Sequence, residues 1–234
     1  MLAKGAKAGS LYPLVVSGSS VDHVLAVGSI PHVSLWHARL GHMSLKGMKM
    51  LSGLQYLPLL DYACFDSCDH CLYGKQNRST HKKSGRPRMS EPLALVHSDV
   101  CGPMPCMSMG GAKYFVTFID DFSRKVWAYP IKLKSDVSAV FQRWLALVEN
   151  QTGYRLKCLR TDNGGEYVSH AFEQFCDDRG IKRQLTAPYT PPQNGLAERM
   201  NRTIQERVRS MLSHAGLPQS FWAEAVSTAV HVIN

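Results

Sequence analysis

Four residues in the first third of the chain have the types and spacing of a metal site. His37 and His42 are separated by four residues in a stretch with helix-like apolar spacing, and Cys68 and Cys71 form a C-x2-C pair further along the chain. Two imidazoles and two thiolates fill all four positions of tetrahedral Zn²⁺, which is the ligand set of a structural site. The sequence therefore predicts one Zn²⁺ that decides whether a small module folds.

Other residues of this region leave alternatives open. Cys64 competes with the two cysteines of the pair, and His70 lies inside the pair as a bystander. The histidines could also be ordinary helix residues and the cysteines core thiols. The chain has seven cysteines, an odd number, and its first residues do not have the pattern of a secretion signal. Reduced thiols in an intracellular compartment are the better interpretation.

Three acidic residues stand where carboxylates can be held around a metal ion. Asp99 follows a predicted apolar strand, Asp162 ends another strand, and Glu198 lies in the first turn of a predicted helix. Carboxylates that are brought together repel each other and favour Mg²⁺, and two such ions about 4 Å apart can activate an attacking oxygen and stabilise a leaving one. Taken singly, each acid also suits a turn or a helix start, and Asp120 and Asp121 are rival carboxylates that a turn would explain.

The composition indicates a globular protein with a polyanionic partner. The 234 residues include 27 Lys and Arg against 18 Asp and Glu, a net charge of +9, and 44% are hydrophobic. No apolar run approaches the roughly 18–20 residues of a membrane span, so we expect no membrane association. An acid-free stretch, either a solvated linker or a contact for phosphates, carries six basic residues: Lys75, Arg78, Lys82, Lys83, Arg86 and Arg88.

The order of predicted elements indicates an α/β fold. Apolar periodicity predicts helices over 35–57, 136–151, 170–179, 196–215 and 221–233. Strands are predicted over 95–100, 113–119, 125–131, 156–160 and 181–185, and one short strand over 11–16. Three successive strands followed by alternating helix and strand suggest a mixed sheet with helices on its faces. The apolar stripe of the last helix must pack on the core or on sequence outside this chain.

Four regions are expected along the chain. Residues 1–30 form an N-terminal segment, residues 31–75 the zinc-binding module, residues 76–92 a basic linker, and residues 93–234 the α/β part.

The residues that carry chemistry resemble those of copia-type LTR retrotransposon polyproteins. Residues 35–42, with Cys68, Cys71, Gly74 and Lys75, resemble the pre-integrase zinc module of that family. The motifs at 97–103, 119–124, 160–167 and 192–199 resemble its integrase core, and the likeness extends over about residues 11–234. Asp162 and Glu198 have 35 residues between them, a spacing typical of retroviral and retrotransposon integrases.

This resemblance implies a five-stranded RNase H-like core with a DDE triad of Asp99, Asp162 and Glu198. The family joins the 3′-hydroxyls of its own DNA copy to target DNA with Mg²⁺ or Mn²⁺. Asp99 and Asp162 would bridge the metals, Glu198 would complete the second site, and Asn194 would sit in a mobile loop beside them. Likeness and helical spacing make these residues candidate DNA contacts: Lys75, Arg78, Lys82, Lys83, Asn194, Asn201, Arg202, Gln205 and Arg209. Salt bridges on a solvated helix face are the alternative for Arg202 and Arg209.

The resemblance also sets expectations about partners and place of action. We expect DNA partners, a homo-oligomer in the full-length form, and action in the nucleus after a stage in a cytoplasmic particle. The chain looks like a piece of a longer polyprotein, and a catalytically idle relic that binds zinc and nucleic acid is the alternative. A plain RNase H nuclease is disfavoured by the zinc module and by the spacing of Asp162 and Glu198.

Overall fold

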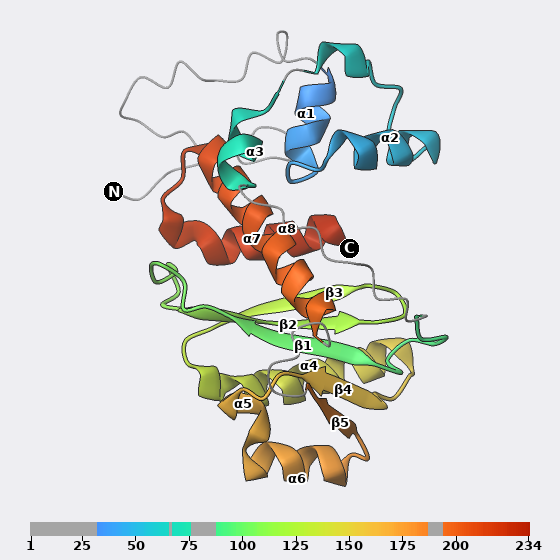
Figure 1. Cartoon of the computed structure of the whole chain (residues 1–234), viewed down its shortest axis with the longest axis vertical. Helices are drawn as coiled ribbons and strands as arrows, with labels where there is room; N and C mark the ends of the chain where they lie inside the picture. The colour runs from blue at the N-terminus through green and yellow to red at the C-terminus, as the bar shows by residue number, and fades with distance from the viewer. Residues whose placement is uncertain (1–31, 66, 76–87, 187–193) are drawn as a thin grey trace, which may run out of the picture.

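The computed structural model describes residues 32–65, 67–75, 88–186 and 194–234 (Figure 1). The strand expected over 11–16 and the basic residues Arg78, Lys82, Lys83 and Arg86 lie outside the described residues. Within the described ranges, no helix combines the length and the apolar character that crossing a membrane requires.

A mixed five-stranded sheet forms the centre of the larger part of the chain. Its strands are β1 Val96–Cys101, β2 Tyr114–Asp120, β3 Val126–Ile131, β4 Cys158–Thr161 and β5 Lys182–Leu185. They lie side by side in the order β3-β2-β1-β4-β5, where β1, β2 and β3 pair antiparallel while β4 and β5 run parallel to β1. The expected mixed sheet is confirmed, and the carboxyl ends of β1 and β4 meet at the same edge.

Helices cover both faces of this sheet (Figure 1). Val116 and Phe118 of β2 pack into one buried cluster with α4 and α6, whereas Phe115 and Ile119 pack into a second with α7 and α8. This division follows from the alternation of side chains along a strand. The helices of this part are α4 Val137–Thr152, α5 Gly165–Val168, α6 His170–Asp178, α7 Gly195–Ala215 and α8 Trp222–Ile233, with 3-10 turns η2 Lys134–Asp136 and η4 Gln219–Phe221.

The apolar stripe of the last helix packs on the sheet. Trp222 and Val226 of α8 are buried in the same cluster as Phe115 of β2. Beyond the helix, the Asn234 side chain accepts a hydrogen bond from the Val126 N–H and donates one to its carbonyl, both at 2.8 Å. Together they tie the end of α8 to β3.

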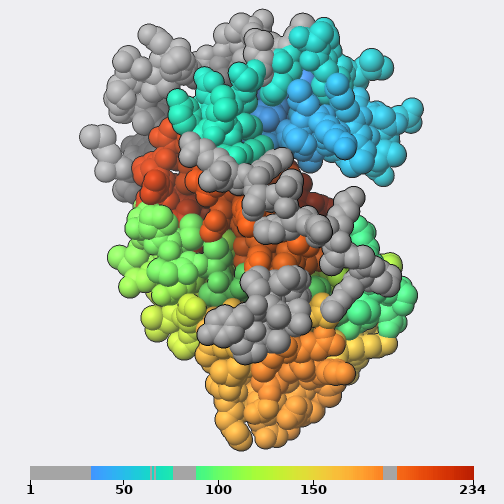
Figure 2. Space-filling model, in the orientation of Figure 1, coloured from blue at the N-terminus to red at the C-terminus, as the bar shows by residue number. Residues whose placement is uncertain are grey.

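The smaller part of the chain is a helical module with a small apolar core. It contains α1 His32–Arg39, α2 Leu45–Gly53, η1 Tyr62–Cys64 and α3 Asp69–Gly74. The single helix expected over 35–57 is wrong, because the chain breaks after α1 at Gly41 and His42, whose φ angles are both 59°. A left-handed turn cannot continue a right-handed helix. Figure 2 shows this module, coloured blue to cyan, at one end of the molecule above the red and orange helices.

Candidate functional site

The first two acids of the predicted triad belong to neighbouring parallel segments, Asp99 within β1 and Asp162 directly after β4. Val96 and His97 of β1 pair with Leu159 and Arg160 of β4. Continued by two residues, this register places Asp99 beside Asp162, on strands about 4.8 Å apart. Because side chains alternate along a strand, both carboxylates project from the same face of the sheet.

Helix α7 brings the third acid to that face. Asn201 of α7 is buried, and its Nδ2 donates a hydrogen bond to Oδ2 of Asp99 at 2.9 Å. Glu198 precedes Asn201 by three residues and so lies on the same side of the helix, with an exposed side chain. The segments that carry the three predicted carboxylates therefore meet at one edge of the sheet.

The surroundings of Asp99 disfavour its charged form. Burial raises the pKa of Asp99 to about 7, and the negative charges of Asp162 and Glu198 act in the same direction. The hydrogen bonds from Asn201 and from the Val100 N–H lower it only partly. A divalent cation at this place would relieve the repulsion, so the residues present fit one or two Mg²⁺ or Mn²⁺ ions.

Two asparagines hold α7 against strand β1. The Nδ2 of Asn194, the residue that precedes α7, donates to the Ser98 carbonyl at 3.1 Å, and the side chain is buried. The Oδ1 of Asn201 accepts a hydrogen bond from the Thr117 hydroxyl at 2.9 Å. The expectation that these asparagines face DNA is therefore corrected, because the helix side that carries Glu198 turns toward β1.

The other expected DNA contacts of α7 differ in their surroundings. Gln205 donates to Sγ of Cys101 at 2.6 Å, and the Arg209 guanidinium donates two hydrogen bonds to the Gly74 carbonyl, at 2.8 and 3.0 Å. Gln205 is half-buried against β1, which corrects its expected role as a free DNA contact, whereas Arg209 is exposed and its guanidinium is held by the Gly74 carbonyl. Arg202, four residues after Glu198, is exposed, as a DNA contact would require.

A buried tyrosine for which the sequence pattern predicted no role supports the site. The Tyr167 side chain, from α5 in the turn after Asp162, places its hydroxyl 2.7 Å from Oγ of Ser98 in β1. Burial raises the pKa of Tyr167 well above its usual range, and the charges of Asp99, Asp162 and Glu166 act in the same direction. The pair links the segments that carry Asp99 and Asp162.

Tyr167→Phe should lower the free energy of unfolding by about 1–2 kcal/mol, because it leaves the fully buried Ser98 hydroxyl without that partner. Urea unfolding followed by tryptophan fluorescence measures the change. Ser98→Ala is the matched single variant, and the double variant should recover part of the loss because both polar groups are gone. A double-mutant cycle without coupling would show that the two hydroxyls do not act as a pair.

The four predicted zinc ligands come together in the smaller module. Their ligand atoms all lie within 4.8 Å of one another. Nε2 of His37 is 3.1 Å from Nδ1 of His42 and 3.2 Å from Sγ of Cys71, while Nδ1 of His42 is 3.5 Å from Sγ of Cys68. Ligands at about 2.0–2.3 Å from a tetrahedral Zn²⁺ lie roughly 3.3–3.8 Å from one another. The cluster thus has the dimensions of a zinc site.

The surroundings of the two histidines suit metal ligation. Nδ1 of His37 lies 2.8 Å from the Met43 carbonyl, a contact that directs the other ring nitrogen toward the cluster. Burial lowers the pKa of His42 to about 3, and burial also lowers that of His37. Both imidazoles are therefore neutral near pH 7, the form that binds a metal. Lys75, an expected DNA contact, instead donates to the His42 carbonyl.

Fold and site together define an integrase-like core preceded by a zinc module. The integrase core domain family matches residues 89–191, and the GAG-pre-integrase domain family matches residues 10–76. A solved structure, the cryo-EM structure of the simian T-cell lymphotropic virus intasome in complex with PP2A regulatory subunit B56 gamma, has a TM-score of 0.53. It is 22% identical in sequence and the match covers 86% of this chain and 68% of that one, so it supports the fold.

Sequence identity to longer proteins identifies the family of this chain. The chain is 50% identical over its full 234 residues to the retrovirus-related Pol polyprotein from transposon TNT 1-94 of Nicotiana tabacum, of which it spans 18%. It is 38% identical over 202 residues, 86% of this chain, to that from transposon RE2 of Arabidopsis thaliana, of which it spans 14%. The chain belongs to the retrovirus-related Pol polyproteins of copia-type retrotransposons.

Proposed function

We propose that this chain is the catalytic part of a DNA integrase that joins 3′-hydroxyl ends of retrotransposon DNA to target DNA. The observation that carries the proposal is the placement of Asp99 beside Asp162, with Glu198 on the helix above them. Burial and the negative charges of Asp162 and Glu198 raise the pKa of Asp99, and a hydrogen bond from Asn201 orients its carboxylate. A site of this kind is built to hold divalent metal.

The proposed reaction exchanges one phosphodiester for another. The oxygen of a 3′-hydroxyl forms a bond to a target phosphorus, the bond from that phosphorus to its own 3′-oxygen breaks, and the proton passes to the departing oxygen. Bound Mg²⁺ or Mn²⁺ would supply the charge that stabilises both oxygens. In this proposal Asp99, Asp162 and Glu198 would hold the ions, while Asn194 and Asn201 keep α7 in place.

The direct test is to incubate the zinc-loaded chain with a labelled duplex that ends in the element's terminal sequence, in Mg²⁺ or Mn²⁺. We expect nicked or joined products that depend on the added metal. Omission of Mg²⁺ and Mn²⁺ is the control, because it leaves zinc in the module. Binding of zinc and DNA without any nicking or joining, in either metal, would instead establish the idle relic as the function.

DNA binding should depend strongly on salt, because the chain carries a net charge of +9 and its exposed arginines can replace counterions on phosphates. Arg202→Gln should weaken binding and reduce the slope of log K against log salt by about one phosphate contact. Fluorescence anisotropy over a salt series measures both.

Lys182→Gln is the matched control for that series. Lys182 is exposed on β5, which forms the edge of the sheet opposite to β3. It removes the same charge but should leave the slope unchanged. Equal slopes for the two variants would remove α7 from the proposed DNA interface.

Assembly and place of action are part of the same proposal. The solved structural neighbour is an intasome, and this chain spans less than a fifth of its curated relatives. We infer that the full-length protein binds paired DNA ends as a homo-oligomer. Its work would take place in the nucleus, after a stage in a cytoplasmic particle.

A further inference from the structure

The zinc module rests on the C-terminal half of the helix that carries Glu198 (Figure 1). The contact is closest at Gly74, the last residue of α3, which is buried against Ser210 of α7. A Cβ on Gly74 would overlap Oγ of Ser210. It would also come within 3.0 Å of the Ser210 backbone nitrogen and 3.1 Å of the Glu206 carbonyl oxygen. Since two of these atoms belong to the helix backbone, no side-chain rotation could make room.

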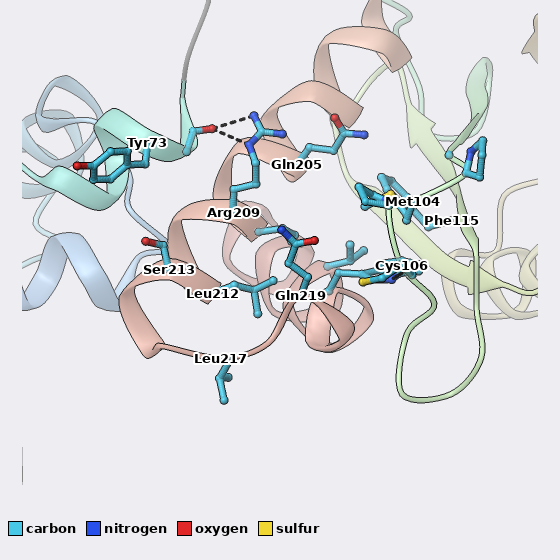
Figure 3. A pocket seen from close by; sticks show the side chains of 17 residues that line it. Tyr73, Met104, Cys106, Phe115, Gln205, Arg209, Leu212, Ser213, Leu217 and Gln219 are labelled. Carbon is cyan, nitrogen blue, oxygen red and sulfur yellow. Dashed lines mark hydrogen bonds between the residues drawn. The ribbon is translucent and has the colours of Figure 1, made fainter. Parts of the chain in front are cut away.

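Hydrogen bonds from α7 reach backbone and side-chain atoms of the module. The two hydrogen bonds from Arg209 to the Gly74 carbonyl are drawn in Figure 3. Arg207 donates to the Leu40 carbonyl at 3.4 Å, and the Ser213 hydroxyl lies 2.9 Å from Nδ1 of His70. These bonds join α7 to both the α1 end and the α3 end of the module.

The last turn of α7 also lies against a predicted zinc ligand. The ring of His214 is 5.2 Å from that of His42 and 4.8 Å from that of His70, measured between centroids. A ring from the catalytic part of the chain thus belongs to the outer shell of the zinc cluster. Such outer-shell groups orient the residues that hold the metal.

The boundary between the two parts is not packed along its whole length. A mainly apolar cavity of about 620 Å³ opens beside the contact, between Tyr73 of the module and Leu212, Leu217 and Trp222 of the core (Figure 3). Gly74 and Arg209 both line it. The close contact at Gly74 and Ser210 therefore has to hold the module in place at this side.

From these contacts we propose that the zinc module positions the triad: its docking at Gly74, Arg209 and Ser210 fixes α7, and α7 in turn sets the place of Glu198 and Asn201. Helix α7 is continuous over Gly195–Ala215. A continuous helix transmits a displacement of one end to the other. This inference rests on the proposed zinc and metal roles of the two clusters, and Gly74, Arg209 and Ser210 act as positioning residues.

Gly74→Ala tests the proposal in the zinc-loaded chain. It changes none of the four zinc ligands, so the variant should keep one equivalent of zinc. Amide hydrogen exchange in α7 should become at least about tenfold faster, because an added methyl in a filled contact forces the elements apart. Binding of Mn²⁺ at the triad, followed by its paramagnetic effect on water relaxation, should weaken by about tenfold or more.

Gly53→Ala is the matched control, because Gly53 also ends a helix of the module but an added Cβ there meets nothing within 4 Å. It should match the natural chain in zinc content, exchange and Mn²⁺ affinity. Gly74→Ala with zinc retained and with unchanged exchange and Mn²⁺ affinity would overturn the proposal.

Arg209→Ala decides the case in which Gly74→Ala fails to keep zinc, since it removes the two bonds to Gly74 and adds no atoms. Faster exchange in α7 with weaker Mn²⁺ binding would support the proposal, and unchanged values would overturn it. Exchange is measured without DNA, so the absence of any joining activity would count against the proposed function and leave this result intact.

Discussion

Asp162→Asn should abolish nicking and joining by this chain while its fold and its zinc stay in place. The change removes one charge at nearly constant shape from a position beside Asp99. Loss of a preorganised charge from a transition state costs about 10²–10³ in rate, and loss of a shared metal ligand should reach at least the upper end. Gel assays with the labelled duplex measure the rate, and metal analysis checks the zinc.

The same variant should be more stable than the natural chain when no divalent metal is bound at the triad. The pKa of Asp99 in the fold, about 7, lies above its ordinary value of 3.8, so this group loses stabilising effect as the pH rises toward 7. Removing the Asp162 charge removes one cause of that rise. Thermal unfolding should therefore give a higher Tm for Asp162→Asn at pH 8, and a difference that shrinks as the pH falls below about 7, where Asp99 takes up a proton in the fold.

Asp121→Asn is the control for this pair of measurements. Asp121 lies close in sequence to the end of β2 but accepts a hydrogen bond from the Met89 N–H and pairs with Arg124 at 2.9 Å. Its pKa is lowered, with the Met89 hydrogen bond the largest of the lowering effects, so its loss should destabilise the fold. If Asp121→Asn lost joining activity as completely as Asp162→Asn in a folded chain, the rival carboxylate would belong to the site.

The sheet was predictable from the sequence because the residues within each strand are sufficient to predict that strand. Nearly continuous runs of apolar, aromatic and β-branched residues in β2 and β3, and shorter segments with such residues in β1 and β4, place every predicted strand of the sheet within one or two residues of its observed bounds. The triad acids were predictable for the same reason, since each stands in or beside one of these elements: Asp99 in β1, Asp162 directly after β4, and Glu198 in the first turn of α7. The apolar pattern locates these elements, and it therefore also locates the acids that stand in or beside them.

The roles of the α7 side chains could not be read in the same way. Helical spacing groups Asn201, Gln205 and Arg209 with Glu198, but spacing alone does not say whether that side faces DNA or protein. Their partners, Asp99, Cys101 and Gly74, come from distant parts of the chain. The left-handed turn at His42 was hidden likewise, because only Gly41 hints at it.

Cys68→Ser should remove zinc from the chain and unfold the module. The module's buried apolar core consists of only four residues in the described part of the chain, Val33, Met48, Leu57 and Leu60. Structural zinc supplies roughly 10–16 kcal/mol of apparent binding free energy near pH 7, more than so small a core can offer. Zinc affinity should fall more than about 100-fold, since changes in outer-shell groups alone cost 10–100-fold. Metal analysis after dialysis measures it.

Cys64→Ser tests whether Cys64 competes with Cys68 as a zinc ligand. Cys68 and Cys71 place their sulfurs 3.5 and 3.6 Å from Nδ1 of His42, within the dimensions of one tetrahedron with His37. Four ligands already close that tetrahedron, so Cys64→Ser should keep one equivalent of zinc and the circular dichroism of the natural chain. Equal zinc loss from Cys64→Ser and Cys68→Ser would contradict the assignment. Loss from Cys68→Ser alone, with the sheet still folded, would show that the metal stabilises the module and that the core's apolar clusters stabilise the sheet.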